Sequence, residues 1–341
     1  MSVDLLSDVL RAVRLRGALF FDIQGRAPWT AEAPPAGDVI PTIMPAAEHL
    51  MEFHGVVRGG CWASIVDDPA APVRLEANDV VIFPQGDPHV LSSRPGERPP
   101  QTGQRDPYYY GPRPAELPIR LSLSGWMPSP GHAPLGAGEE ETHVVCGFLG
   151  LDAKPFNPLL AALPRVLLVS GSTLGPESWV TAFLRTAVVE SEERRPGSEA
   201  VLERMSEMLF LEVLRRYVAS LPEGETGWLA GVQDPVVGPA LGRLHGDPGA
   251  DWTLERLADS VAVSRSLLAE RFTTLVGQPP MQYLARWRMQ VASGLLRDGG
   301  ATIAEIASEV GYESEAAFSR AFKRVVGVSP SAWRAGMRAQ G

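Results

Sequence analysis

The stretch GYESEAAFSRAFKRVVGVSP, Gly311–Pro330, has the pattern of a short, capped helix near the C-terminus. Ser314 stands where a side-chain hydroxyl can accept a backbone N–H of the first turn. Phe318, Phe322 and Val325 follow at helical spacing and predict one apolar face. The opposite face carries small and basic side chains. We therefore predict a helix that packs by one face and presents the other to another molecule.

An earlier stretch repeats this pattern. LERLADSVAVSRSLLAERFTTLVGQPP (254–280) and IAEIASEVGYESEAAFSRAFKRVVGVSP (303–330) each predict a helix, a tight turn and a second helix. The residues that recur fifty positions apart are Leu268, Phe272, Gly277 and Pro280, which become Phe318, Phe322, Gly327 and Pro330. A helix pair whose second helix keeps its outer face free has the geometry of a helix-turn-helix. Two copies joined by a helical stretch favour DNA binding over a pair of packed hairpins.

The tandem arrangement, from about Pro239 to Arg338, resembles the C-terminal DNA-binding domain of the AraC/XylS family of transcription regulators. The resemblance implies two recognition helices in adjacent major grooves on one DNA face. Carried over by position, the DNA-facing residues are the caps Ser264 and Ser314, then Arg265, Ser266, Ala269 and Glu270 in the first unit and Glu315, Ala316, Ser319 and Arg320 in the second. Lys323 and, on the joining helix, Arg286 and Arg288 stand ready to reach phosphates.

The two predicted recognition helices differ in charge. Ala269 can contact only a thymine methyl, and Glu270 repels phosphate unless it meets a cytosine amino group. Arg320 can read guanine or hold a phosphate, and Lys323 can neutralise the DNA backbone. We therefore expect the second unit to contribute more of the electrostatic attraction to DNA.

The charge of the chain is unevenly distributed. Its 341 residues carry a formal net charge of −9. Residues 239–341 hold 12 basic and 10 acidic side chains, whereas the remainder holds 19 basic and 30 acidic ones. An acidic N-terminal part therefore precedes a weakly basic C-terminal one. No apolar run approaches the roughly 20 residues that a membrane crossing needs, and no signal-peptide pattern begins the chain, so we expect a cytoplasmic protein with no membrane partner.

From about Trp29 to Asp152, short apolar runs alternate with turn residues, a texture that predicts an antiparallel barrel or sandwich. The run NDVVIFPQGDPHVL carries Pro84, Gly86 and His89 in the order P-x-G-x-x-H. The region resembles the cupin-type sensor domain found ahead of AraC-type DNA-binding domains. That resemblance implies that His89 points into the barrel, often onto a metal. The usual metal motif is broken, because His49 and His54 occupy its second histidine and glutamate positions and Ala47 the first.

A metal and a redox hypothesis both follow from these residues. His54 and His89, joined by His143 or Cys146, form a tetrahedral set for Zn²⁺ or another divalent metal. His143 and Cys146 are three apart and face opposite sides of a regular strand, so both ligate only where the strand bulges or ends. The alternative is that these side chains are packed or hydrogen-bonded in a ligand pocket. Cys61 and Cys146 are candidate redox sensors, or simply inert buried thiols.

We predict an α+β fold, in which an N-terminal cupin-like β-barrel precedes an all-α C-terminal domain with two helix-turn-helix units. The predicted domains are 1–152 for the sensor, 153–238 for a helical dimerisation and linker region, and 239–341 for DNA binding. The predicted function is a homodimeric transcription regulator, not an enzyme, controlled by an effector, metal or oxidant. Its partners would be promoter DNA and, for an activator, RNA polymerase. Two alternatives are a metal-dependent cupin enzyme with a helical appendage and a protein-interaction module.

Overall fold

A computed structural model describes residues 4–101, 106–132, 141–171, 178–222 and 224–338. The chain divides into two compact units, which are described separately. The sheet unit contains Leu15–Leu151 and Leu163–Ala219. The helical unit contains the N-terminal residues up to Arg14, the segment Asp152–Ala162 and the residues from Ser220 onward.

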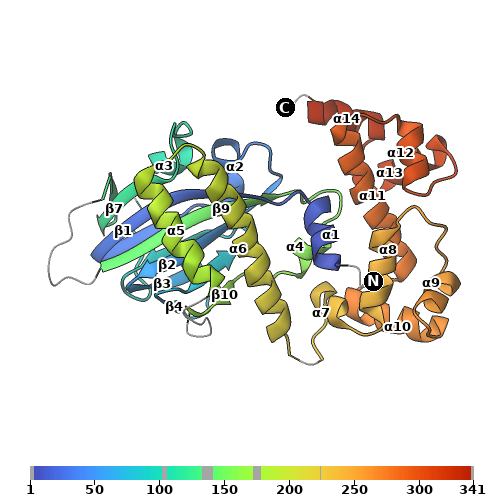
Figure 1. Ribbon diagram of the computed structural model, residues 1–341, viewed down its shortest axis with the longest axis horizontal. Helices are drawn as coiled ribbons and strands as arrows, with labels where there is room; N and C mark the ends of the chain where they lie inside the picture. The colour runs from blue at the N-terminus through green and yellow to red at the C-terminus, as the bar shows by residue number, and fades with distance from the viewer. Residues whose placement is uncertain (1–3, 102–105, 133–140, 172–177, 223, 339–341) are drawn as a thin grey trace. The chain divides into compact units, whose positions relative to one another are not determined.

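The sheet unit is built on a curled, mostly antiparallel sheet, which forms a half-barrel (Figure 1). Its strand order in the described residues is β10-β5-β2-β9-β1-β6-β3-β4, with β7 parallel to β1 and β8 paired to β7. The strands are β1 (Arg16–Ala33), β2 (His49–Arg58), β3 (Gly60–Ile65), β4 (Val73–Glu76), β5 (Val80–Phe83), β6 (His89–Ser92), β7 (Ile119–Gly125), β8 (Met127–Pro130), β9 (Glu141–Leu151) and β10 (Leu167–Val169).

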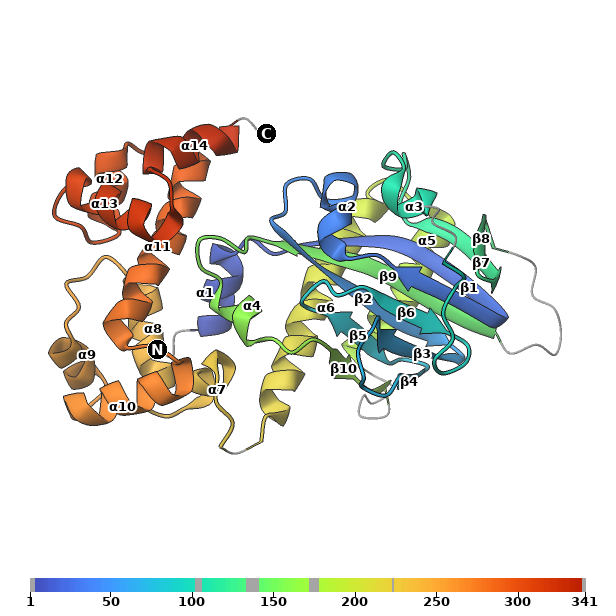
Figure 2. The same ribbon diagram turned by 180° about the vertical axis from the view of Figure 1, so that it is seen from behind.

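Side chains alternate between the two faces of this sheet. On β2, Leu50 and Val56 point into the core cluster of the half-barrel, while Phe53 points to the other face and meets Phe183 of α5. Helices α5 (Trp179–Glu193) and α6 (Ser198–Ser220) cover that outer face (Figures 1 and 2). Gly55 allows the close approach, because a Cβ there would lie 2.3 Å from Leu184. Two short helices, α2 (Ala36–Ile43) and α3 (Pro107–Tyr110), complete the unit.

The helical unit contains the two predicted helix-turn-helix pairs. The hydroxyls of Ser264 and Ser314 accept hydrogen bonds from the backbone N–H groups of Leu267 and Ala317, each at 3.2 Å. Both predicted caps are therefore confirmed. Its helices are α1 (Leu5–Ala12), α4 (Pro158–Ala162), α7 (Trp228–Gln233), α8 (Val237–Gly246), α9 (Leu254–Ser260), α10 (Arg265–Val276), α11 (Pro280–Asp298), α12 (Ile303–Glu309), α13 (Glu315–Val326) and α14 (Pro330–Arg338). The predicted fold class is confirmed, with a half-barrel as its β part.

The units differ from the predicted domains at the N-terminus and at both ends of the predicted central region, because residues from Ser220 onward also belong to the helical unit. Helices α5 and α6 belong to the sheet unit, although the sequence suggested a separate central region. Helix α1 and the segment after β9 belong to the helical unit. The side chain of Gln290, on α11, contacts both of these segments. Its Nε2 donates to the carbonyl of Ala12 at 3.2 Å, and its Oε1 accepts the backbone N–H of Phe156 at 3.0 Å. In the described part of the chain, no helix is long and apolar enough to span a membrane.

Candidate functional site

Helix α13, the second recognition helix, presents an exposed polar face. Phe318 and Phe322 are fully buried and hold the helix in the core of its pair. The predicted DNA-facing residues lie on the other side, where Glu315, Ala316, Arg320 and Lys323 are exposed and Ser319 is half-buried. Within the described residues, neither Arg320 nor Lys323 forms an ion pair. Both cations are therefore available to a DNA phosphate or base.

Helix α10, the first recognition helix, has its basic side chains neutralised inside the helical unit. Arg265 forms an ion pair with Glu255 of α9. Arg271 binds Asp234 through Nε at 2.8 Å and Nη2 at 2.7 Å. Of the other predicted DNA-facing positions, Ser266 and Glu270 are exposed and Ala269 is half-buried. The charge difference between the two recognition helices is thus larger than their sequences alone indicate.

The predicted role of Arg288 requires correction. Its half-buried guanidinium donates at 2.7–3.2 Å to three backbone carbonyls, those of Pro248, Ala250 and Gly311. Because every nitrogen of this guanidinium is engaged within the helical unit, Arg288 ties the loop before α9 to the turn of the second helix pair, which disfavours the predicted phosphate contact. The neighbouring Arg286 lies over the ring of Phe156, 4.2 Å from its centroid, and donates to Gln278 at 3.3 Å.

Three side chains meet inside the half-barrel. The Nε2 atoms of His54 and His89 lie 2.7 Å apart, and each is 3.9 Å from one carboxyl oxygen of Glu52. His89 Nδ1 lies 2.8 Å from the carbonyl of Asp87, which can only accept, so Nδ1 carries the proton and Nε2 a lone pair. His54 Nε2 then donates to His89, which leaves His54 Nδ1 buried without a partner. We call Glu52, His54 and His89 the interior triad.

The interior triad is neutral at neutral pH. Burial raises the pKa of Glu52 to about 8, against the opposing effect of a hydrogen bond from Tyr109. Burial lowers the pKa of His89 to about 4 and holds that of His54 well below its ordinary value. The site thus presents two buried imidazoles and a buried carboxyl group, a donor set that suits a divalent metal.

The four predicted metal ligands do not come together. Cys146 lies beside His54 as its register partner on β9, but His143 belongs to a separate cluster with Asp22. Strand β9 pairs regularly with β1 from His143 to Cys146, so the three-residue spacing places these two side chains on opposite faces. Glu52 was missed by the sequence reasoning. Its signal was the two-residue spacing to His54, which puts both on one face of a strand.

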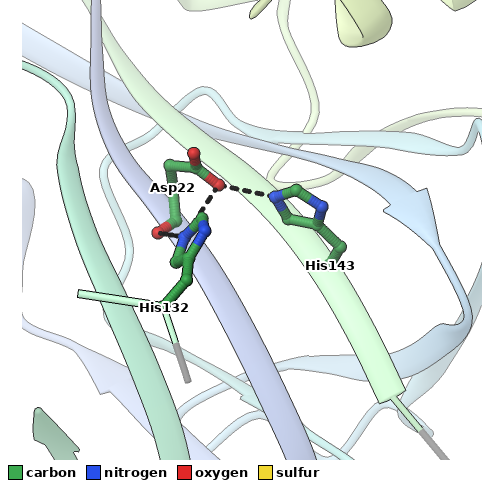
Figure 3. Close-up of side chains that lie close together, drawn as sticks. All are labelled: Asp22, His132 and His143. Atoms are coloured by element: carbon green, nitrogen blue, oxygen red, sulfur yellow. Dashed lines mark hydrogen bonds and ion pairs between the residues drawn. The ribbon is translucent and has the colours of Figure 1, made fainter. Parts of the chain in front are cut away.

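The second cluster is centred on Asp22 of β1, whose side chain is fully buried (Figure 3). Its Oδ1 lies 2.5 Å from Nε2 of His143 and 3.4 Å from Nε2 of His132. Its Oδ2 accepts the hydroxyl of Ser191, on α5, at 2.5 Å. One carboxylate therefore connects β1, β9, α5 and the residues that follow β8. We call Asp22, His132, His143 and Ser191 the outer cluster.

The hydrogen bonds of the outer cluster favour a structural role over metal binding. Arg120 can only donate, and its Nη2 lies 3.2 Å from His132 Nδ1, so His132 carries its proton on Nε2. That proton goes to the backbone carbonyl of Asp22 at 3.0 Å. A metal ion bound to Nε2 of His132 would have to displace this proton. Burial alone would raise the pKa of Asp22, but its interactions with the nearby His132 and with the hydrogen-bond donors His143 and Ser191 outweigh burial and hold that pKa well below its ordinary value.

Both cysteines are buried free thiols. Burial raises the pKa of Cys61 to about 12 and that of Cys146 well above its ordinary value. The thiolate is the form that reacts with oxidants, so both side chains are predominantly in their unreactive form at neutral pH. This chemistry favours the packing role of the two thiols over the redox hypothesis.

A cavity of about 600 Å³ opens in the sheet unit. Phe21 and Ile23 of β1, the tyrosines of α3, and Leu121 and Leu123 of β7 contribute to its wall. The hydroxyl of Tyr109 donates to Glu52 at 3.2 Å, so this wall connects the cavity to the interior triad. Cavities of this size and apolar character are typical of small-molecule sites.

Two known protein families match this chain, one over its N-terminal part and one over its C-terminal part. The profile of the Cupin family matches residues 4–219, and that of a helix-turn-helix domain matches residues 257–336. The chain is 32% identical to a protein of Streptomyces lividans named as an AraC-like transcription regulator, across 97% of this chain and 98% of that protein. A protein of Streptomyces antibioticus with the same name is 34% identical across 88% of this chain and 98% of its own length.

Two further proteins resemble parts of the chain. The HTH-type transcriptional regulator AlkR of Acinetobacter baylyi is 36% identical across 54% of this chain and 60% of its own length. The DNA-binding domain of AdpA, whose crystal structure is in complex with a target DNA, has 31% sequence identity to this chain. The match has a TM-score of 0.30 and covers 32% of this chain and 96% of that domain. The full-length relatives are named as regulators, which favours a non-enzyme over a cupin enzyme with a helical appendage. The chain belongs to the AraC family of DNA-binding transcription regulators, with a cupin domain ahead of its helix-turn-helix domain.

Proposed function

We propose that this regulator binds a small-molecule effector in the cavity of its cupin domain, and that occupancy changes how it binds promoter DNA. The observation that supports the proposal is the cavity of about 600 Å³, whose wall is built from β1, α3, β7 and β8. Its volume lies in the range of sites that enclose drug-sized molecules. The effector must bind the two functional states with different affinities, because a ligand of equal affinity for both shifts nothing.

The connectivity of the sheet supports a route from the cavity to the helical unit. Strand β1 carries cavity residues and begins at Arg16, immediately after the part of the chain that belongs to the helical unit. Strand β9 pairs with β1 along its length and ends at Leu151. The next residue, Asp152, binds Arg14 at 3.1 Å and also pairs with Arg297 of α11. Two neighbouring strands thus lead directly into segments that are anchored in the DNA-binding unit.

Filling the cavity should abolish the response to effectors. Ala31 is half-buried and lines the cavity, so Ala31→Phe places a ring in the space that a ligand would occupy. In a thermal-shift screen of metabolites, we expect compounds that raise the melting temperature of the wild type to have no effect on the variant. A ligand at 100 times its Kd stabilises a protein by about 2.7 kcal/mol, which such a screen detects readily.

The matched control for Ala31→Phe is Ala63→Val, which changes a buried strand residue outside the cavity wall. That variant should keep the wild-type responses. Gel shifts with the DNA upstream of the gene should show that Ala31→Phe still binds DNA. Compounds that stabilise the wild type and Ala31→Phe equally would remove the cavity from the proposal.

A bound divalent metal at the interior triad is the second candidate for control, and a specific observation favours it. His89 donates its Nδ1 proton to a backbone carbonyl, the arrangement that orients most metal-binding histidines. His54 Nε2 and the Glu52 carboxyl group approach the same point. Zn²⁺ held there would be a structural or sensory ion, and Glu52 would supply it with a negative charge.

Elemental analysis tests whether the interior triad binds a metal ion. Protein purified without chelators, then dialysed with Zn²⁺, should retain about one equivalent per chain, because the triad supplies three donors. His89→Ala should lose this metal, whereas His143→Gln, which changes the outer cluster, should keep it. Wild-type protein without stoichiometric metal, or equal retention by His89→Ala, would exclude the interior triad as a metal site.

Two finer features of the function stay proposals. A homodimer is supported by the exposed apolar side chains Val201 and Met208 on α6 and Val189 on α5. Base recognition by Arg320 is supported by its exposure on α13 and by the absence of an ion pair to it within the described residues. RNA polymerase becomes a partner if the protein activates transcription.

A further inference from the structure

The cavity of the cupin domain has a charge bias. Among its described lining residues, the charged side chains are the two carboxylates of Glu32 and Asp106, and none is basic. Much of the remaining wall is aromatic: Phe21, Tyr108, Tyr109, Tyr110 and Trp126. Carboxylates and aromatic faces both attract cations, and both disfavour anions. The described part of the lining therefore favours a cationic ligand over an anionic one.

The two carboxylates differ in their availability. Glu32 is neutralised by Arg98, whose Nε and Nη2 donate to its two oxygens at 3.0 and 2.9 Å. Asp106 has no such counter-ion in the described part of the chain. One of its oxygens accepts the backbone amide of Tyr108 at 2.8 Å and so caps α3. Burial raises the pKa of Asp106, against the opposing effect of that hydrogen bond.

Aromatic side chains complete the surroundings of Asp106. Three consecutive tyrosines follow it on α3, and all three line the cavity. Trp126 also lines the cavity yet keeps 38% of its surface exposed, and the adjacent Met127 keeps 60%. Large apolar side chains left exposed beside a cavity are typical of binding sites. The buried side chains of Phe21, Leu121 and Leu123 provide an apolar wall for the body of a ligand.

We propose that the effector is an organic cation with an apolar, aromatic body. Its charged group binds the carboxylate of Asp106 and the faces of the neighbouring aromatic rings. Its apolar body packs against Phe21, Leu121 and Leu123. The inference rests on the proposed effector function of the same cavity. It adds the chemical class of the ligand and identifies Asp106 as the residue that determines the preference for positive charge.

Three naphthalene probes of similar size separate charge from shape. They are 1-naphthylmethylamine, which is protonated at neutral pH, the neutral 1-naphthylmethanol, and the anion 1-naphthoate. In isothermal titration calorimetry with the full-length protein, we expect the amine to bind at least tenfold more tightly than the alcohol, and naphthoate not to bind. A tenfold change in Kd corresponds to about 1.4 kcal/mol, within the range of a partly desolvated cation–π or ion-pair contact.

The variant Asp106→Asn tests whether Asp106 causes the preference for a positively charged ligand. Asparagine is as good a helix cap as aspartate, so α3 should be preserved while the charge is lost. We expect the affinity for the amine to fall about tenfold and the affinity for the alcohol to stay unchanged. Glu76→Gln removes the same charge from β4, outside the cavity wall, and should alter neither affinity.

The outcomes distinguish the ligand class from the effector proposal itself. The cation assignment is overturned if naphthoate or the alcohol binds as tightly as the amine, if Asp106→Asn leaves the amine unaffected, or if the amine does not bind. In each case the metabolite screen with Ala31→Phe still decides whether the cavity receives an effector at all. Failure of that screen would remove both proposals.

Discussion

Asp22→Ala should lower the free energy of unfolding of the sheet unit by about 3–5 kcal/mol, the range measured when one member of a buried ionic group is removed. The carboxylate of Asp22 is fully buried and accepts hydrogen bonds from His143 and Ser191, each at 2.5 Å. Alanine leaves those donors buried without an acceptor. It also releases the contact that joins β1 and β9 to α5.

Urea unfolding followed by circular dichroism measures this effect. Asp22→Asn is the informative companion, because it keeps the shape and one acceptor and removes only the charge, so its loss should be smaller. Asp38→Ala is the matched control: it removes an exposed carboxylate from the first turn of α2 and should cost less than about 1 kcal/mol. A comparably small loss for Asp22→Ala would show that the outer cluster contributes little to stability.

The outer cluster also makes the free energy of unfolding depend on pH. The pKa of Asp22 is held below its ordinary value, so its contribution is present above about pH 4 and is lost as the pH falls toward the folded pKa. Burial alone would lower the pKa of His132, but its bonds to Asp22 outweigh burial and raise it. The contribution of His132 is therefore full below about pH 6.5 and is lost as the pH rises through its folded pKa. The difference between wild type and Asp22→Ala should be largest between these limits.

Arg320→Ala should weaken binding to the specific promoter site by about 1–3 kcal/mol, or roughly 10- to 100-fold, the usual loss for an arginine that reads a base. Arg320 lies exposed on α13, the recognition helix whose cations remain unpaired within the described residues. Lys323→Ala should act differently. A phosphate contact weakens binding to all sequences about equally and reduces the slope of log affinity against log salt by about one.

Arg265→Ala is the control, because Arg265 is an exposed arginine of α10 that is already paired with Glu255. We expect it to lose less affinity than Arg320→Ala. Fluorescence anisotropy with the upstream DNA fragment, repeated at several salt concentrations, measures all three variants, and circular dichroism confirms that each is folded. An Arg320→Ala protein that still protects its operator in a footprint would refute the assignment.

The helix-turn-helix pairs could be predicted in detail because their determinants are local. Ser314 caps the residues that follow it, and Phe318 and Phe322 form an apolar face through the helical repeat. The repeated glycines at the helix ends, Gly277 and Gly327, adopt left-handed conformations. Such signals lie within a few residues of the feature that they specify, so a single sequence contains them.

The charge state of the recognition helices was only partly predictable. The sequence shows that α13 has more basic side chains than α10 on its outer face. It does not show that Arg265 and Arg271 are already bound to Glu255 and Asp234, because those partners lie on α9 and at the C-terminal end of α7. Arg288 illustrates the same limit, since three carbonyls distant in the chain determine that its guanidinium serves the fold.

The sequence by itself therefore determined the order of domains, the duplicated DNA-binding helices and the cupin-like domain, because periodicity, caps and short motifs carry that information. Only the tertiary structure decided which side chains share a site. The curl of the sheet brought His89 of β6 to Glu52 and His54 of β2, and strand register sent His143 to Asp22 on the other face. Contacts with α11 assigned α1 and Asp152 to the helical unit. Register and packing bring together residues more than a hundred positions apart, and no local pattern specifies which of them will meet.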